Sequence, residues 1–462
     1  MTNKRPLKIF FSGIGGSGVS AIASFMADKG HTVVGSDRAF DQNPDHPVCG
    51  ALRSKGITIV PQDGAGIDRS FDLAVFSTAV EPDRPEVIRA KSLGIPTKTR
   101  PEFLSEIVTT FRTLAVAGTS GKSTTSGMLA FLMERLGMEP NFIGGGRVKQ
   151  FRTETNPGNS ITGNSDHLVI EACESDGTIV TYQPRHSIIL NLDLDHHPVD
   201  ETAAMFSALM RNTSGMIVVD NDDRNLGGIA PASRGVVSFS IEAPADYRAT
   251  DILYRPFSTE FSLRAHGGIP TRFTLSLPGR CNLSNALACI ALLSEMGIPL
   301  EEIAQTLPGF AGIERRFDIR LNDGKRLVID DYAHNPQKIS ALMAAMDRIS
   351  ERICYIFQPH GFGPVRMMKA EYIDSFVTNL RDCDHLILLP IFYAGGAVSR
   401  DVSSHDLAEG IRAGGGSVEV IRDRETVLKR TGEWDSYVIF GARDESLSLF
   451  AGEIAASLMR RS

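Results

Sequence analysis

The sequence lacks several features that would assign it to a particular class of protein. Its six cysteines, in a chain of 462 residues, are scattered and form no Cys-x-x-Cys pair. They predict reduced thiols of the cytosol rather than a disulfide framework or a zinc site. No apolar run approaches the length of a membrane span, and the short run after Lys4 and Arg5 meets glycines too soon for a signal peptide. We therefore expect a cytoplasmic protein.

An excess of positive charge is also missing. The formal net charge of −7 argues against a general binder of nucleic acid or of anionic membranes, although it leaves room for local basic pockets. A hydrophobic content of 42% with 22% charged residues is ordinary for a globular protein. Repeats, heptads and low-complexity tracts are absent, and the length suits two to four domains with their own cores.

One glycine-rich stretch is the most informative part of the chain. The apolar run 114–117 predicts a buried strand, two glycines interrupt it, and residues 124–136 have helical apolar spacing. A strand, a glycine turn and a helix preceded by Lys122 and Ser123 describe a cradle for a nucleoside triphosphate. The backbone N–H groups and the lysine hold the phosphates, and the hydroxyl holds Mg²⁺. Val116 stands where the general pattern has glycine, so a chance turn is the alternative.

A second glycine-rich turn, residues 13–18, follows the predicted strand 8–12 and precedes a helix that runs to Lys29. The next strand, 32–35, is followed by Asp37, the acidic residue that a dinucleotide fold would place there. Two interpretations stay open. The turn is either a second phosphate-binding loop, for a dinucleotide or a nucleotide sugar, or a tight strand–helix connection with Asp37 as a helix cap.

Acidic and histidine residues follow two strands of the central region. Glu171 ends the predicted strand 167–171, and His196 follows the strand 187–192. Because ligands of α/β sheets bind beyond the carboxyl ends of the strands, both side chains can meet a magnesium ion beside Ser123. Capping or surface charge is the alternative for each residue taken singly.

The alternation of strands and helices predicts an α/β fold of three domains. We expect a Rossmann-like domain over residues 1–111 and a central phosphate-loop domain over 112–312, with a mostly parallel sheet. Residues 245–277 should add a small antiparallel part to that sheet. A Rossmann-like domain over 313–462 completes the chain.

Polar residues mark two further places. The amides of Asn282 and Asn285 lie on one face of a predicted helix, where they either read a base edge or cap the helix start. In the last domain, polar groups again gather at strand ends. These are Asp330, Asp331, His334, Asn335, His360, Arg443 and Asp444.

Nine motifs, in this order along nearly the whole chain, resemble the Mur ligase family. They are GIGGSG with SDR, STAV at 77–80, GTSGKSTT, EACESDG at 171–177, NLDLDH at 191–196, PGRCNLSNA at 278–286, GIERRF at 312–317, DDYAHNP at 330–336 and FQPH at 357–360. The resemblance implies an ATP-dependent ligase of peptidoglycan synthesis or recycling. Such a ligase joins an amino acid or peptide to UDP-N-acetylmuramate through an acyl phosphate. It implies ATP and Mg²⁺ as cofactors, no nucleic-acid or membrane partner, and a monomer or homodimer.

The resemblance also implies roles for individual residues. The UDP part of the substrate would contact Gly13, Ile14, Gly15, Gly16, Ser17, Gly18, Asp37, Ser77, Thr78 and Ala79. ATP would contact Gly118, Thr119, Ser120, Gly121, Lys122, Ser123, Thr124, Asn282, Asn285, Arg316 and Asp331. Metal ligands would be Ser123, Glu171 and His196. The amine would meet His334, Asn335, His360 and Arg366. The residues expected to act in catalysis are Lys122, His196, Arg316, His334 and His360.

Departures from the family pattern concern the amine. Residues 361–366 read Gly-Phe-Gly-Pro-Val-Arg, which leaves Arg366 as the one arginine where the family grips the amino acid, and Asn335 replaces a histidine. A ligase with another acceptor or amine is therefore the main alternative, and a non-catalytic nucleotide-binding relative is another. An NAD-dependent oxidoreductase would explain residues 13–18 and leave Lys122 without a role.

Overall fold

The computed structural model describes residues 5–194, 197–229, 235–393 and 399–460. The chain divides into two compact units, Met1–Gly312 and Ile313–Ser462, each of which is described by itself. Within those described ranges, every helix is too short or too polar to cross a bilayer.

The first sheet has the strand order β3-β2-β1-β4-β5, and all its neighbouring strands are parallel. Its strands are β1 Lys8–Ser12, β2 Thr32–Ser36, β3 Thr58–Ile59, β4 Leu73–Phe76 and β5 Thr97–Thr99. Its helices are α1 Ser17–Asp28, α2 Arg38–Gln42, α3 Pro47–Ser54, α4 Pro85–Ser92 and α5 Arg100–Val108. The chain builds the sheet in one direction from β1 to β3 and in the other from β4 to β5, so the strand order changes direction between β1 and β4. The turn after β1 therefore lies at the switch point where such sheets bind ligands.

The central sheet runs β15-β14-β13-β12-β11-β10-β6-β9-β7-β8. The first strands of this region are β6 Arg112–Ala117, β7 Asn141–Ile143, β8 Ser160–Ile161, β9 His167–Glu171 and β10 His186–Ile189. The later strands are β11 Ile217–Asp220, β12 Val236–Ser240, β13 Tyr247–Tyr254, β14 Thr259–Ala265 and β15 Thr271–Leu275. Pairing is parallel from β7 to β13, whereas β14, β15 and β8 join antiparallel, as predicted for 245–277.

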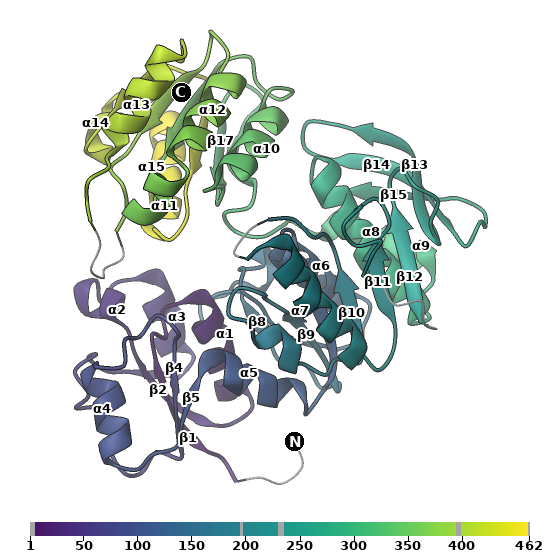
Figure 1. Cartoon of the computed structure of the whole chain (residues 1–462), viewed down its shortest axis with the longest axis vertical. Coiled ribbons are helices and arrows are strands. Elements are labelled where there is room, and N and C mark those ends of the chain that lie inside the picture. Colours follow the sequence, from purple (N-terminus) through teal and green to yellow (C-terminus); the bar gives the residue numbers. More distant parts are fainter. Residues whose placement is uncertain (1–4, 195–196, 230–234, 394–398, 461–462) are drawn as a thin grey trace. The chain divides into compact units, whose positions relative to one another are not determined.

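Helices cover the central sheet. They are α6 Lys122–Arg135, α7 Val199–Asn212, α8 Arg280–Glu295 and α9 Leu300–Thr306, with short 3-10 turns η1 Lys149–Phe151, η2 Thr178–Thr181 and η3 Leu307–Gly309. Residues 124–133 of α6 are all buried, as expected of a helix enclosed on every side. α8 packs against α6 and against β11 and β12 (Figure 1). α8 therefore lies beside α6 and against the strands at one side of the central sheet.

The first and central sheets belong to one unit and share a hydrophobic core. Polar contacts join them as well. Arg100, at the start of α5, donates to Asp176 at 2.6 Å, and the Asn159 amide donates to the Ser17 carbonyl at 2.6 Å and to the Ser20 hydroxyl at 2.9 Å. The glycine turn that ends at α1 is thus tied to the central region.

The second unit is built on the strand order β16-β17-β21-β18-β19-β20. Its strands are β16 Asp318–Asn322, β17 Leu327–Asp331, β18 Ile353–Phe357, β19 His385–Leu388, β20 Val418–Val420 and β21 Ser436–Phe440. Its helices are α10 Pro336–Met346, α11 Phe362–Met367, α12 Lys369–Asn379, α13 Ser404–Ala413, α14 Arg424–Lys429 and α15 Ser446–Arg460. Only β16 pairs antiparallel among these described strands. The predicted α/β class with three sheet-bearing regions is confirmed.

Candidate functional site

The turn between β6 and α6 has the form of a phosphate loop. Gly121 has φ +83°, a left-handed conformation that favours glycine, and α6 begins at the next residue. A Cβ at this position would also overlap the side-chain oxygen of Asn285 in α8. Both the backbone conformation and the packing against α8 therefore require glycine here.

Lys122 is held inside this turn. Its ammonium donates to the Gly118 carbonyl at 2.6 Å and to Oε2 of Glu174 at 2.8 Å. The Glu174 side chain is only 1% exposed and that of Lys122 13%. Burial disfavours the charged ammonium, but the neighbouring Cys173 and Glu174 outweigh that effect, so the pKa of Lys122 is raised. The lysine is therefore fully charged at neutral pH and one of its three N–H groups is left for a ligand.

The predicted metal ligands Ser123 and Glu171 lie together. The Ser123 hydroxyl donates to Oε2 of Glu171 at 3.0 Å, while Oε1 accepts the N–H groups of Gly145 and Gly146 at 2.6 and 3.2 Å. A hydroxyl and an oriented carboxylate are hard oxygen donors of the kind that Mg²⁺ uses, so these residues fit the ion. Over the described ranges, no three His, Cys, Asp or Glu side chains form a metal cluster. His196, the third predicted ligand, lies outside the described residues.

Asn191 shapes the other side of the loop. Its Oδ1 accepts the Thr119 hydroxyl and the Ser120 N–H, both at 2.8 Å, and its amide nitrogen donates to the Ser120 carbonyl at 3.1 Å. Asn191 begins the NLDLDH motif, but sequence reasoning gave it no role. Its place in that motif, shortly after a strand, was the feature that could have predicted its contact with the neighbouring loop. Thr124, another predicted ATP contact, is buried in the first turn of α6.

The two amides predicted to contact a base occupy different environments on α8. Asn285 is 5% exposed and lies against Gly121, whereas the amide of Asn282 donates to the Pro278 carbonyl at 2.8 Å. Among the described residues, neither amide is a cap of α8, because the N-cap residue Gly279 has no side-chain cap hydrogen bond and the Asn282 amide donates to a carbonyl. Adenine recognition by either side chain stays a prediction.

In the first sheet, Asp37 caps a helix, as the second interpretation of its turn expected, whereas phosphate binding by the turn stays a prediction. Its Oδ1 accepts the Ala39 N–H at 2.9 Å and so caps α2, while Oδ2 accepts the Gly15 N–H at 2.8 Å and so braces the glycine turn. The other residues predicted to contact UDP lie in the turns after β1 and β4 or at the start of α1. These are Gly13, Ile14, Gly16, Ser17, Gly18, Ser77, Thr78 and Ala79. Their contacts with UDP stay predictions.

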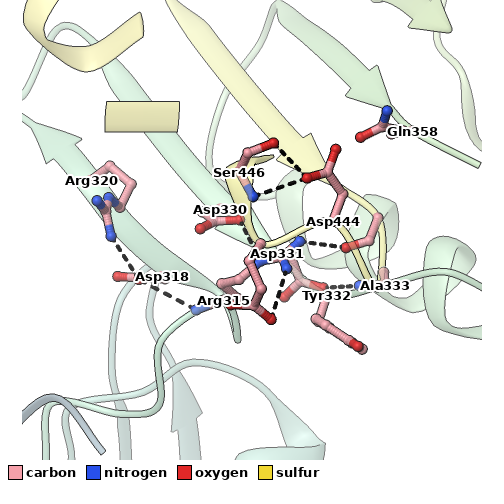
Figure 2. Close-up of polar contacts among 12 residues, drawn as sticks. Arg315, Asp318, Arg320, Asp330, Asp331, Tyr332, Ala333, Gln358, Asp444 and Ser446 are labelled. Atoms are coloured by element: carbon pink, nitrogen blue, oxygen red, sulfur yellow. Dashed lines mark hydrogen bonds and ion pairs between the residues drawn. The ribbon is translucent and has the colours of Figure 1, made fainter. Parts of the chain in front are cut away.

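In the second unit, Asp330 and Asp331 are the last two residues of β17, and their carboxylates have different partners (Figure 2). Asp331 accepts the N–H groups of Phe317 and Ala333, both at 2.7 Å. Burial raises the pKa of Asp331, and the charge of Arg316 opposes that shift. This carboxylate shapes the turn that follows β17.

Asp330 is fully buried and faces Arg315 (Figure 2). The Nε of Arg315 lies 3.5 Å from Oδ1 of Asp330, and Nη2 donates to the Gly441 carbonyl at 2.6 Å. Sequence reasoning noted both residues within motifs but did not pair them. The arginine therefore links β17 to the segment after β21.

His334 and His360 are neighbours, with ring centroids 5.3 Å apart. Burial lowers the pKa of each to about 4, so both rings are neutral at pH 7. Nδ1 of His334 lies 2.9 Å from the Tyr332 carbonyl, an arrangement that assigns the proton to Nδ1 and leaves Nε2 as an acceptor. Nδ1 of His360 is buried without a hydrogen bond in the described part of the chain.

The other two residues predicted to meet the amine have local partners. Asn335 caps α10, because its Oδ1 accepts the Lys338 N–H at 2.9 Å. Arg366 lies on the surface of α11 and donates through Nε to Asp401 at 2.9 Å and through Nη2 to the Ser399 carbonyl at 2.9 Å. Arg316 lies over the Tyr332 ring, with its guanidinium carbon 4.7 Å from the centroid. Catalytic or binding roles for all three stay predictions.

The loop geometry defines a class of protein, an α/β protein with a phosphate-binding loop beside an oriented carboxylate. Comparison with protein families extends this assignment. The Mur ligase family, catalytic domain, matches residues 8–112; the Mur ligase middle domain matches 116–293; and the Mur ligase, glutamate ligase domain, matches 315–443. The chain belongs to the Mur ligase family.

Individual relatives agree with this assignment. UDP-N-acetylmuramate–L-alanine ligase of Sulfurihydrogenibium sp. is 33% identical over 97% of this chain and 95% of its own. The enzyme of that name from Geobacter sulfurreducens is 35% identical over 91% of this chain and 90% of its own. Among solved structures, UDP-N-acetylmuramate–alanine ligase of Thermotoga maritima has a TM-score of 0.82 at 25% identity, covering 98% of this chain and 99% of its own. A murein peptide ligase of Psychrobacter arcticus, with a TM-score of 0.73 at 23% identity, covers 98% of both chains and shares the fold.

Proposed function

We propose that the protein is an ATP-dependent ligase that joins the carboxylate of UDP-N-acetylmuramate to an amine, an amino acid or a peptide, in peptidoglycan synthesis or recycling. The observation that carries the proposal is the loop in which Lys122 and the Ser123–Glu171 pair lie side by side. The names of the curated relatives, which are ligases of UDP-N-acetylmuramate and L-alanine, support the acceptor.

A carboxylate is a poor acyl donor, so the reaction needs activation. The acceptor carboxylate attacks the γ-phosphorus of ATP, which gives an acyl phosphate and ADP. Two anions approach each other in this step, and the Lys122 ammonium and the loop N–H groups offset their repulsion. Mg²⁺ held by Ser123 and Glu171 would neutralise charge on the phosphate oxygens.

The amine then attacks the acyl phosphate carbon, and inorganic phosphate leaves from the tetrahedral intermediate. The attacking nitrogen must lose a proton in this step. We assign its acceptor to the pair His334 and His360, because both imidazoles are neutral above about pH 4 and therefore have a free lone pair. With pKa values of about 4 the two imidazoles are weak bases, suited to the acidic N–H of the tetrahedral intermediate rather than to a free ammonium.

The identity of the amine is the open part of the proposal. Arg366, the arginine expected to bind an amino-acid carboxylate, is already bonded to Asp401 and Ser399. An amine other than alanine, or a peptide, is therefore the second candidate within the same reaction. We further propose a cytoplasmic location, supported by six free thiols, and a monomeric or homodimeric protein.

The test is a panel of amines incubated with ATP, Mg²⁺ and UDP-N-acetylmuramate, in which ADP release and product mass are measured. We expect ADP release that requires both acceptor and amine, together with one product whose mass equals acceptor plus amine minus water. Turnover with a muropeptide-like amine and none with L-alanine would support the second candidate. An absence of ADP release with every amine would refute the ligase function.

A further inference from the structure

The lysine of the phosphate loop is bound by a carboxylate to which the proposed reaction assigns no role. Glu174 follows β9 by three residues and is fully buried. Its Oε2 accepts a hydrogen bond from Lys122 at 2.8 Å, and its other oxygen, Oε1, is buried without a hydrogen bond among the described residues. A buried carboxylate normally has several donors, because desolvation of an unpaired charge is costly. Glu174 therefore depends on Lys122 for its place.

The geometry at Lys122 shows what this contact does. An ammonium has three N–H groups and no acceptor. Two of them are used, one by the Gly118 carbonyl at 2.6 Å and one by Glu174. Because the three N–H bonds are tetrahedral about Nζ, fixing two of them fixes the direction of the third. A lysine stem otherwise rotates freely and its ammonium can take many orientations.

We propose that Glu174 is a positioning residue for phosphoryl transfer, which holds the Lys122 ammonium so that its remaining N–H is directed at the γ-phosphate. This inference rests on the proposed function. Glu171, three residues earlier, instead faces Ser123 and the N–H groups of Gly145 and Gly146. The two carboxylates of this short segment thus have different roles: Glu171 would bind the metal, and Glu174 orients the lysine.

Positioning predicts that kcat falls more than nucleotide binding. In Glu174→Ala the lysine keeps its charge and still attracts phosphate, but its ammonium is no longer oriented. We expect kcat to fall by about 100-fold, the effect of misplacing a reacting group by about 1 Å. The Kd of a non-hydrolysable ATP analogue, measured by calorimetry, should change by less than about threefold. Glu174→Gln retains an acceptor oxygen of the same reach, and we expect it to restore kcat to within about tenfold of the wild type.

A matched control separates positioning from loss of a buried carboxylate. Asp384 is also buried, accepts the Ile353 N–H at 3.0 Å and pairs with Arg381 at 2.8 Å, in the second unit. Asp384→Ala should lower the melting temperature without a selective loss of kcat in the folded protein. In a Lys122→Ala background, Glu174→Ala should cause no further loss of kcat, because Glu174 acts through the lysine.

A measurement independent of turnover completes the test. Labelling of Lys122 by an amine-reactive reagent, followed by peptide mass spectrometry, should be several-fold faster in Glu174→Ala than in wild type, and unchanged in Asp384→Ala. Equal labelling rates, an unchanged kcat, or a weakened analogue affinity with kcat intact would each overturn the proposal. A wild type that shows no ADP release would refute the ligase function instead, and the labelling comparison would still decide whether Glu174 holds the lysine.

Discussion

Two buried pairs of opposite charge, Lys122–Glu174 in the first unit and Arg315–Asp330 in the second, have different geometry. In the first pair the two charged atoms lie 2.8 Å apart and share a hydrogen bond. In the second the nearest charged atoms are 3.5 Å apart, and both oxygens of Asp330 lack a hydrogen bond among the described residues (Figure 2).

The difference in geometry between the two pairs follows from the shapes of the ammonium and guanidinium groups. Lysine is a compact charge whose orientation is set by its partners, so a short contact defines where it can bind a phosphate. The Arg315 guanidinium instead carries its N–H donors on three nitrogens. One of these nitrogens, Nη2, donates a short hydrogen bond to the Gly441 carbonyl. A buried ion pair contributes little net stability, but removal of one partner is costly. We therefore expect loss of either cation to lower the stability of the fold, and loss of Lys122 to lower turnover in addition.

The largest expected effect is on turnover. Lys122→Ala should reduce kcat by about 1,000-fold, since it removes a full positive charge from the transferring phosphoryl group. The melting temperature should fall as well, because the buried Glu174 carboxylate loses its cation. ADP release and differential scanning calorimetry would measure the two quantities. Retention of wild-type kcat would contradict the assignment of the loop.

Arg315→Met should lower stability without the loss of phosphoryl transfer expected for Lys122→Ala. It leaves the buried Asp330 carboxylate without its cation, and we expect a loss of about 3–5 kcal/mol in the free energy of unfolding. Arg320→Met is the matched control, because Arg320 is 27% exposed and its buried partner Asp318, 3.3 Å away, still accepts the Arg315 N–H at 3.4 Å (Figure 2). Its expected loss is below about 1 kcal/mol. Urea unfolding would measure both losses, and equal losses would refute the greater dependence of Asp330 on its cation.

The pH dependence of stability gives a third test. Burial raises the pKa of Asp330 from 3.8 to about 6, against the opposing charge of Arg315. The folded state therefore holds this proton more tightly than the unfolded state does. The associated stability is complete below about pH 3.8 and is lost as the pH rises through 6. Relative to Asp330→Asn, which does not titrate, the wild type should lose on the order of 2 kcal/mol between pH 4 and 7.5. Parallel stability curves would refute this assignment.

The smallest expected stability effect concerns Arg366. Its pair with Asp401 is exposed on the surface, so Arg366→Ala should change the free energy of unfolding by less than about 1 kcal/mol. The informative quantity is the KM for the amine. If Arg366 binds an amino-acid carboxylate, KM should rise about tenfold or more with kcat little changed. An unchanged KM would remove Arg366 from the amine site.

Much of the fold was predictable because parallel strands buried on both faces give continuous apolar runs. β1 and β9 have their predicted bounds, and the antiparallel addition formed where polar and apolar residues alternate. Short elements such as α2 and α3 were not predicted. Five to eight residues carry too little periodicity to distinguish a helix from a loop.

The site was only partly predictable, and the reason is distance along the chain. Lys122, Ser123 and Glu171 follow from a motif whose chemistry is local. The Glu174 contact spans 52 residues, and the Arg366 bond to Asp401 spans 35. No residue pattern shows which of several acidic side chains meets a given cation. The cap role of Asn335 was available from its place before Pro336 at a helix start.

The contact of Asn285 with Gly121 has a consequence for protein engineering. Even a methyl group at position 121 would overlap the asparagine oxygen. Helix α8 therefore limits the side chains that the phosphate loop can carry. A designer who wishes to enlarge or reshape the loop must therefore redesign position 285 at the same time. Segments 118–125 and 280–295 therefore have to be transferred together if the loop is grafted onto another protein.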